Sequence, residues 1–466
     1  MKHNIKLCYI GGGSKQWARV FMSDLALTEG LSGEMALYDI DKESAKRNAK
    51  IGGYINANPK TKSQFTYVVY DNLEEALLNA DFVIMSILPG TFKEMRSDVH
   101  VPEKYGIYQS VGDTAGPGGV LRAMRTVPLY QEFAEKIKAI CPKAWVINFT
   151  NPMSICMKAL YDVFPDIQAF GCCHEVFHAQ ELFAVMLKEL RGIEVTRKDI
   201  YTDASGVNHF TWITEARYQD MDLMKLIPEF IDKFAEEGYY EGYDRFAFKT
   251  DPFAYGNKVK FDLYQRYGAL AAAGDRHLAE FVSNQWYLKD PQTVKDWQFN
   301  LTTVDFREEQ LAERVAETIE MSEGRKEFPL EKSSEEAVEI MKALLGEKTL
   351  VTNVNMPNVG QMPQMPLGSI VETNCVFTND TAAPVSAKPL PTGAANLVYR
   401  CCVNIDNTYE GIKARDLNVI YQAFVNQALC NCLTMDEAEQ LFKEMCMNTR
   451  EYLDPYYNLD KYFCAK

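Results

Sequence analysis

The chain has 466 residues and a formal net charge of −15; 47% of its residues are hydrophobic and 24% are charged. This length suits two or three domains, and this composition is that of an ordinary soluble globular protein. The acidic balance and the lack of any lysine- or arginine-rich run argue against a nucleic acid or an anionic membrane as partner, and no stretch has the ~18 apolar residues of a membrane span. A small molecule is the ligand class that fits best.

The N-terminus carries no pattern of a secretory signal, because a strand-like run begins directly after Met1–Asn4 and no small-residue cleavage site follows. We therefore expect a cytoplasmic protein. In that compartment the 12 cysteines should remain reduced thiols, most of them buried as small apolar side chains.

Short apolar runs of the buried-strand type alternate with helical patterns along the first part of the chain. Six runs are expected to be strands: 6–10, 35–38, 66–70, 82–87, 145–149 and 167–172. This alternation predicts a parallel sheet, and the glycine-rich first turn favours the doubly wound strand order 3-2-1-4-5-6. We predict an α/β Rossmann domain over residues 1–195, similar in fold to lactate and malate dehydrogenases.

Residues 196–466 have a different pattern, which predicts a mixed α/β substrate domain packed against the first. The sequence predicts helical stretches over 308–327, 334–345, 412–433 and 435–453, and a section rich in Pro, Gly and Asn from 353 to 393.

The first turn has the features of a dinucleotide site. Gly11, Gly12, Gly13 and Ser14 join the first strand to a helix, where glycines let the backbone approach a pyrophosphate and the helix N-terminus offers free N–H groups. The match to G-x-G-x-x-G is partial, because a glutamine takes the place of the third glycine. Asp39 ends the second strand and would repel a 2′-phosphate, so the pattern favours NAD over NADP. A turn or a helix cap is the alternative role for Asp39.

Polar residues follow the ends of the next strands, where ligands bind in a doubly wound sheet. Arg96 follows the fourth strand, Asn148 to Pro152 end the fifth, and Cys173, His174 and Glu175 follow the sixth.

Three of the six histidines, His174, His178 and His209, fall within a short window beside Cys173. This clustering favours a metal site, since thiolates and imidazoles are metal ligands. The glycine-rich stretch from Ser110 to Gly119 is either a plain surface loop or a mobile cover over the site.

His174 to His178 also read as H-E-x-x-H, the zinc motif of metallopeptidases. A peptidase is therefore an alternative from another enzyme class. However, the motif follows directly on an apolar strand, so we expect His174 in the strand-to-helix turn and His178 to point elsewhere. The peptidase hypothesis also leaves the NAD features unexplained.

Several motifs are more specific as a set than each is alone. They are Gly11–Ser14, Arg96 with Asp98, Gly116–Gly119 with Arg122, Asn148–Pro152, Cys173–His174, Gly206–His209 and the section from Val371 to Pro391. As a set they resemble glycoside hydrolase family 4, the NAD- and manganese-dependent glycosidases, from the N-terminus to about residue 440. Cys-His-Glu-Val at 173–176 resembles the α-galacturonidase subgroup, whereas α-galactosidases and α-glucosidases look like Cys-His-Ser-Val.

The resemblance implies a redox route that departs from the usual two-carboxylate hydrolysis of glycosides. NAD takes hydride from C3 of the sugar, the C2 proton is removed, the aglycone leaves from C1, water adds, and the hydride returns. Cys173 and His209 are implied to hold Mn²⁺ or another divalent ion, which acts as a Lewis acid on the C2 and C3 oxygens. His174 is implied to protonate the leaving oxygen, Asn148 to lie with the cofactor, and Asn151 to bind sugar hydroxyls near the nicotinamide.

The base that removes the C2 proton departs from the family pattern. Many members carry a tyrosine just after an Arg-aromatic-Gly sequence, but here Arg266-Tyr267-Gly268 is followed by Ala269. Asp275 is the nearest substitute and Tyr267 the reserve candidate. A solvated loop charge is the alternative for Asp275.

A uronate substrate needs a cation for its carboxylate, and the arginine fork is suited to this task. Arg96 and Arg276 are the candidates. Glu175 is expected to contact a sugar hydroxyl or a group beside the metal.

Three functions therefore remain open. The first is a family 4 hydrolase of α-galacturonides, with α-galactosidase or α-glucuronidase activity as alternatives. The second is a lactate/malate-type NAD dehydrogenase, and the third is a non-catalytic NAD-binding sensor. We expect a small, pectin-derived carbohydrate as substrate, and neither nucleic acid nor membrane as partner. The resemblance implies a homodimer or homotetramer.

Overall fold

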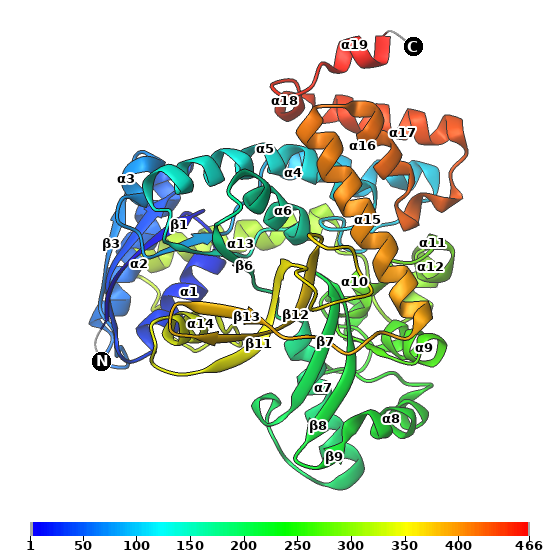
Figure 1. Cartoon of the computed structure of the whole chain (residues 1–466), viewed down its shortest axis with the longest axis horizontal. Coiled ribbons are helices and arrows are strands. Elements are labelled where there is room, and N and C mark those ends of the chain that lie inside the picture. The colour runs from blue at the N-terminus through cyan, green and yellow to red at the C-terminus, as the bar shows by residue number, and fades with distance from the viewer. Residues whose placement is uncertain (1–2, 465–466) are drawn as a thin grey trace.

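The computed structural model of this protein describes residues 3–464, which fold around one large mixed sheet (Figure 1). Its strands are β1 (His3–Ile10), β2 (Leu31–Tyr38), β3 (Phe65–Val69), β4 (Phe82–Met85), β5 (Trp145–Asn148), β6 (Gln168–Gly171), β7 (Tyr201–Val207), β8 (Phe210–Tyr218), β9 (Met221–Asp222), β10 (Leu270–Ala271), β11 (Leu350–Pro357), β12 (Ile370–Thr378) and β13 (Thr381–Pro384).

The first six strands form the predicted doubly wound half of the sheet. They are parallel and follow the order β3-β2-β1-β4-β5-β6, which confirms the predicted fold class and strand order. Their register brings the carboxyl ends level: Ile10 pairs with Tyr38 and Met85, Met85 with Asn148, and Asn148 with Gly171. The segments that follow these strands therefore meet along one edge of the sheet, where ligands bind in this fold.

The helices are α1 (Trp17–Ala26), α2 (Lys42–Ala57), α3 (Leu73–Leu77), α4 (Phe92–His100), α5 (Gly116–Ile140), α6 (Met153–Val163), α7 (Glu175–Arg191), α8 (Ile227–Phe234), α9 (Lys258–Tyr267), α10 (Asp275–Ala279), α11 (Asn284–Tyr287), α12 (Pro291–Asp296), α13 (Val304–Ser322), α14 (Ala337–Leu344), α15 (Thr392–Ala414), α16 (Leu417–Val425), α17 (Met435–Asn448), α18 (Arg450–Leu453) and α19 (Leu459–Cys464).

Helices cover both faces of the parallel strands because alternate strand residues point to opposite sides. In β1, Cys8 and Ile10 join the apolar cluster that contains residues of α5 and α6, whereas Leu7 and Tyr9 join the cluster that contains residues of α1, α2 and α14. Strands that are buried on both faces carry continuous apolar runs, which explains why the sequence marks them so clearly.

The second half of the chain extends the same sheet in antiparallel fashion. The strand order continues from β6 through β11, β12, β7 and β8 to β10, with one register pair, Asn355 with Gly171, joining β11 to β6. The division of the chain near residue 195 stays a prediction, since the sheet runs without a break through both parts.

The predicted helix over 412–433 is wrong as a single element. Arg415, with φ of 56°, lies in the left-handed region and ends α15, and the Asp416 side chain then caps α16. The side chain of Asp416 accepts from the N–H of Asn418, so the chain changes direction within one hydrogen-bonded turn. The 353–393 section, predicted only as rich in Pro, Gly and Asn, contains most of β11 and all of β12 and β13.

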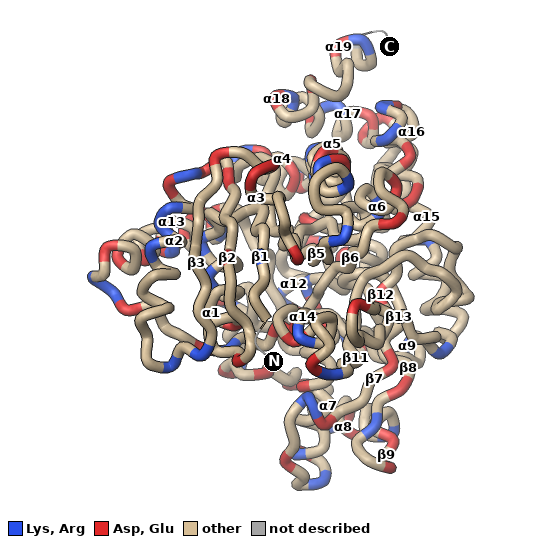
Figure 2. The backbone as a smooth tube through the Cα atoms, turned by 60° about the vertical axis from the view of Figure 1, so that its left-hand side comes forward, with Lys and Arg blue, Asp and Glu red and all other residues tan. Residues whose placement is uncertain are grey.

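Charged residues are found mainly in the outer helices and loops, and the parallel strands contain few of them (Figure 2). Within residues 3–464, no helix is long and apolar enough to cross a membrane. The eleven cysteines whose side chains are described are free thiols, and most of them are buried.

Candidate active site

The glycine turn after β1 is held in place by backbone contacts that only glycine allows. The N–H groups of Gly11 and Gly12 both donate to the carbonyl of Tyr38 at 2.9 Å. Gly11 has a φ of 100°, and a Cβ there would lie 2.0 Å from the carbonyl oxygen of Ser86. The turn therefore lies flat against the ends of β2 and β4, as an approaching pyrophosphate requires.

Asp39 lies directly against this turn. Its Oδ2 accepts from the N–H of Gly13 at 2.8 Å and its Oδ1 from the N–H of Asp41 at 2.8 Å. Asn48, which the sequence did not single out, donates its side-chain amide to the carbonyls of Gly12 and Ser14, both at 2.8 Å. The five residues predicted for the start of the cofactor site, Gly11 to Ser14 and Asp39, are thus brought together.

The end of β5 supplies two asparagines with different surroundings. Asn148 is fully buried, and its amide is engaged: Oδ1 accepts from Tyr130 Oη at 2.6 Å and from the N–H of Thr150 at 3.0 Å. Asn151 presents a buried Oδ1 that has no partner among the described residues, and its carbonyl accepts from Arg122 Nε at 3.0 Å. Asn151 therefore has a free acceptor for a ligand, whereas Asn148 orders the loop.

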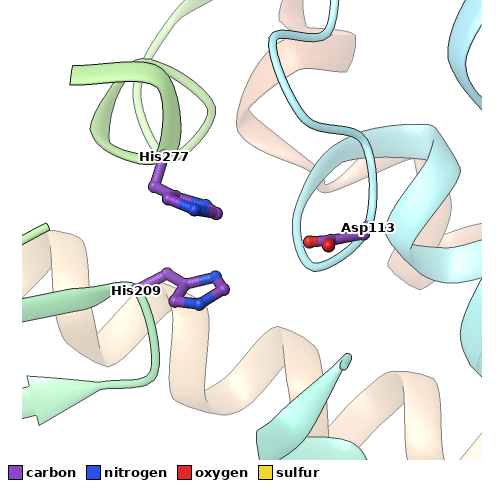
Figure 3. A group of neighbouring side chains, drawn as sticks. All are labelled: Asp113, His209 and His277. Atoms are coloured by element: carbon purple, nitrogen blue, oxygen red, sulfur yellow. The ribbon is translucent and has the colours of Figure 1, made fainter. Parts of the chain in front are cut away.

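A cluster of possible metal ligands lies across this edge, formed by Asp113, His209 and His277 (Figure 3). One ligand atom from each residue lies within 4.8 Å of the other two. The two imidazole rings lie against each other, with centroids 3.9 Å apart and ring planes tilted by 39°. The three residues come from the glycine-rich loop before α5, the turn between β7 and β8, and α10, so only the tertiary structure brings them together.

The electrostatics of the cluster favour metal binding. Burial lowers the pKa of His209, and it lowers that of His277 to about 3, so both rings are neutral and keep a lone pair for a ligand. Burial would raise the pKa of Asp113, but the positive charges of Arg122 and Arg307 hold it well below the usual range. Two neutral imidazoles and one carboxylate are a donor set that suits a divalent transition metal.

The predicted partner of His209 lies outside this cluster. Cys173 follows β6 and is buried, but its thiol is not among the ligand atoms grouped within 4.8 Å in the described part of the chain. Burial raises the pKa of the Cys173 thiol well above its usual range, and its carbonyl accepts from Asn353 Nδ2 at 3.3 Å. Cys173 as a metal ligand stays a prediction.

The H-E-x-x-H residues form a second group next to the first. His174 occupies the N-cap position of α7, in the strand-to-helix turn as expected. The expectation that His178 points elsewhere is wrong: ligand atoms of His174, Glu175 and His178 lie within 4.8 Å of one another. Four residues make about one helical turn, so His178 returns to the side of the helix that faces His174.

His174 and Glu175 each have a defined partner. His174 Nδ1 lies 3.1 Å from Glu335 Oε1, and although burial would lower the pKa of His174, this hydrogen bond raises it to about 9. Glu175 is buried, and its Oε2 accepts from the N–H of Gly274 at 2.8 Å. Its Oε1 lies 3.6 Å from His277 Nε2, so Glu175 links the two groups.

The two candidates for the base differ sharply in their surroundings. Asp275 is fully buried at the start of α10, with Oδ1 accepting from the N–H of Lys260 at 3.0 Å and Oδ2 without a partner among the described residues. Burial raises the pKa of Asp275 to about 6. Tyr267 instead packs its ring against Trp212, 5.8 Å away, in the apolar core.

The two candidate arginines also differ. Arg96 lies on the surface and pairs with Asp305 at 2.7 Å and Glu308 at 3.1 Å. Arg276 is buried, donates to Thr302 Oγ1 at 2.6 Å, and has no carboxylate partner among the described residues. Of the two, Arg276 keeps its charge available for a ligand.

Sequence reasoning missed Asp113 and Asn48 and gave His277 no role. Asp113 lies inside the glycine-rich stretch 110–119 that was noted as a possible cover, and a carboxylate in such a loop was the available signal. His277 follows the candidate arginine Arg276 directly in α10. Asn48 offered no signal, since a helical asparagine is ordinary until its contacts are known.

Comparison with known proteins identifies close relatives. A family model described as family 4 glycosyl hydrolase matches residues 6–189, and the model of its C-terminal domain matches residues 204–430. The chain is 50% identical to an α-galacturonidase of Thermoanaerobacter italicus over 97% of this chain and 99% of the relative. It is 46% identical to an α-galacturonidase of Bacillus subtilis over 95% and 96%. An α-galactosidase of the same organism is 28% identical, over 90% and 91%.

Solved structures agree on the fold. The crystal structure of a protein from Bacillus subtilis, described as a candidate glucosidase, has a TM-score of 0.89 and 45% identity, over 95% of this chain and 99% of that chain. A 6-phospho-α-glucosidase from gut microorganisms, solved in complex with NAD and Mn²⁺, has a TM-score of 0.78 and 19% identity, over 97% and 99%.

Proposed function

Because the chain belongs to glycosyl hydrolase family 4, we propose that it is an α-galacturonidase that depends on NAD and a divalent metal ion. The relatives that bear this name match nearly the full length of the chain, at identities well above that of the α-galactosidase. The observation that carries the choice of a uronide is Arg276, a buried cation beside the polar cluster that forms no ion pair with any carboxylate of the described residues. Burying such a charge is costly unless an anionic ligand joins it.

The glycine turn and Asp39 would hold the cofactor. Gly11, Gly12 and Gly13 let the pyrophosphate approach the start of α1, Ser14 extends the turn, and Asp39 lies where a ribose would bind. Asn148 supports this part of the site through the loop that leads to Asn151. When bound, NAD supplies a reversible hydride acceptor for C3 of the sugar, so the net redox change is zero.

The divalent ion, Mn²⁺ in our proposal, would be held by His209, together with Asp113 and His277, and with Cys173 once its thiol is deprotonated. The fit rests on the neutral, adjacent imidazoles and the ionised carboxylate beside them. The ion supplies Lewis-acid stabilisation of negative charge on the C2 and C3 oxygens.

Asp275 would remove the proton from C2. With a pKa of about 6 the carboxylate is ionised at neutral pH, and its partnerless Oδ2 is free to accept a proton. Tyr267 remains the reserve candidate. His174, protonated at neutral pH through its contact with Glu335, would donate a proton to the glycosidic oxygen as the aglycone leaves.

Asn151, Glu175 and Arg276 would bind the sugar itself. The side-chain oxygen Oδ1 of Asn151 is free to accept from a sugar hydroxyl. Glu175 would orient the start of α10 through the N–H of Gly274 and contact a sugar hydroxyl or His277. Arg276 would take the carboxylate. Arg96, already paired with two carboxylates at the surface, is the weaker candidate.

The test is hydrolysis of nitrophenyl α-galacturonide, α-glucuronide and α-galactoside with NAD and Mn²⁺, with and without a thiol reductant. We expect release of nitrophenol from the galacturonide, dependence on both cofactors and no accumulation of NADH. Net NADH formation without cleavage would instead indicate a dehydrogenase, and binding of NAD without turnover a sensor. Cleavage of the galactoside alone would contradict the uronide assignment.

A further inference from the structure

We propose that Arg276 and Arg307 together form the site for the C6 carboxylate of the sugar, and so select uronides over hexosides. This inference rests on the proposed function and deepens it, because it assigns the specificity to a pair of arginines of which one, Arg307, has no place in any motif of the sequence.

The first observation is that both guanidinium groups converge on one residue. Arg276 Nη1 donates to Thr302 Oγ1 at 2.6 Å, and Arg307 Nε donates to the carbonyl of Thr302 at 3.3 Å. Arg307 Nη2 also donates to the carbonyl of Val111 at 2.7 Å. Two arginines from α10 and α13 are thus fixed in neighbouring positions.

The second observation is that their partners are neutral. Both arginines are bonded to a hydroxyl or to backbone carbonyls, and neither forms an ion pair within residues 3–464. The Arg276 guanidinium lies 4.6 Å from the centre of the Phe253 ring, which orients it without neutralising it. Each guanidinium has five N–H donors, so both keep donors for a ligand.

The nearby acids Asp113, Glu175 and Glu280 act on the charges of the two arginines from a distance, but within residues 3–464 none of them forms an ion pair with either arginine. Glu280 is fully buried, accepts from the N–H groups of Val111 and Gly112 at 2.8 and 2.9 Å, and is protonated at neutral pH because burial raises its pKa to about 8. Glu175 is bonded to Gly274 and lies against His277. Asp113 belongs to the metal-ligand cluster. The arginine pair therefore keeps its positive charge, which favours an anion.

The position of the pair fits a sugar carboxylate. Arg276 directly precedes His277 in α10, and the carbonyl of Arg276 accepts from Ser110 Oγ at 2.5 Å, in the loop that carries Asp113. A monosaccharide held at the cluster would present one end to this loop. Two guanidinium groups can bind both oxygens of a carboxylate, whereas the hydroxymethyl group of a hexose offers no charge.

The experiment measures binding of free D-galacturonate and D-galactose by calorimetry, with the full chain in NAD and Mn²⁺. We expect the wild type to bind galacturonate at least about tenfold more tightly than galactose, since a hydrogen bond to a charged group is worth more than a neutral one. Arg276→Gln and Arg307→Gln should each remove most of this preference, because they weaken galacturonate binding far more than galactose binding.

Two comparisons make the result specific. Arg325→Gln, an exposed arginine just beyond α13, is the matched control and should keep the wild-type preference. Arg307→Lys keeps a charge but loses the fork, and should give an intermediate preference; it also serves if Arg307→Gln fails to fold.

Three outcomes would overturn the inference. In the first, the arginine variants bind both sugars equally more weakly, which indicates a structural role only. In the second, the preference for galacturonate is lost in Arg96→Gln instead. In the third, the wild type shows no preference between the two sugars. These outcomes are independent of the cleavage assay: a protein that prefers galacturonate through Arg276 and Arg307 but cleaves no uronide would contradict the proposed function and not this site.

Discussion

The cofactor turn and the metal-ligand cluster lie at the same edge of the sheet but are built in different ways. The turn is made of neighbours in sequence, Gly11 to Ser14, closed by Asp39 of the next strand, and every contact that shapes it involves backbone. The cluster is made of single side chains, Asp113, His209 and His277, from three separate segments. We therefore expect the first site to be sensitive to any added side-chain atom, and the second to the loss of a ligand atom.

The sharpest test of this difference is a single added methyl group in the turn. Gly11→Ala should destabilise the protein by at least about 2 kcal/mol and abolish NAD binding, because the Cβ would overlap the Ser86 carbonyl and the φ of 100° is unfavourable for alanine. Gly53→Ala in α2 is the matched control, since its Cβ would meet nothing within 4 Å, and it should be neutral or slightly stabilising. Thermal unfolding and NAD titration measure both effects. Normal NAD binding by the Gly11→Ala variant would contradict the requirement for glycine in this turn.

At the cluster, removal of one ligand should leave the fold intact and remove the metal. His209→Ala should weaken Mn²⁺ binding by more than about 100-fold, with little change in melting temperature. Replacing a residue that only hydrogen-bonds to a metal ligand typically weakens metal binding by about 10- to 100-fold, so a larger loss identifies a direct ligand. His277→Ala and Cys173→Ser then separate the two donor sets: the variant with the larger loss of Mn²⁺, measured by calorimetry or electron paramagnetic resonance, identifies the third ligand. Unchanged Mn²⁺ affinity in His209→Ala would contradict the proposal that this cluster binds the metal ion.

The smallest effect is a shift in the pH profile. Asp275 must be ionised to take a proton, so activity should fall as the pH drops below about 6. His174 must be protonated to donate one, so activity should fall as the pH rises above about 9. Glu335→Gln removes the carboxylate that raises the His174 pKa, and should move only the alkaline limb, toward lower pH. A profile whose acid limb moves instead would contradict the assignment of His174 as the acid.

The difference between the cofactor turn and the metal-ligand cluster also explains which parts of the site could be predicted from the sequence. Gly11–Ser14 and Asp39 were recognisable because the requirement for glycine and for a carboxylate at a strand end is local. His209 was recognisable through the clustering of histidines and through a family motif. Its neighbour Asp113 was missed, since no spacing rule links a loop residue to a turn so far along the chain. His178 was predicted to point away because the turn at His174 was treated as a break, whereas the α-helix that follows brings the two rings together.

The choice between the two arginines shows the same limit. Arg96 and Arg276 were equal candidates by residue type, and only burial and pairing separate them. Arg96 lies at the surface and pairs with two carboxylates, whereas Arg276 lies in the interior and pairs with no carboxylate in the part of the chain that the structure describes. Arg307 carried no signal at all, because its importance comes from sharing Thr302 with Arg276.

By itself the sequence determined the parallel half of the sheet, its strand order and the cofactor turn. Apolar runs, helical periodicity and glycine conformation act over a few residues, so their physical causes can be read along the chain. The tertiary structure decided that the second half continues the same sheet, that Asp113 and His277 join His209, and that Arg276 and Arg307 form no ion pair with the acids of residues 3–464. These features depend on which segments, distant in sequence, pack together and exclude water. The resulting burial then shifts the pKa of each titratable side chain.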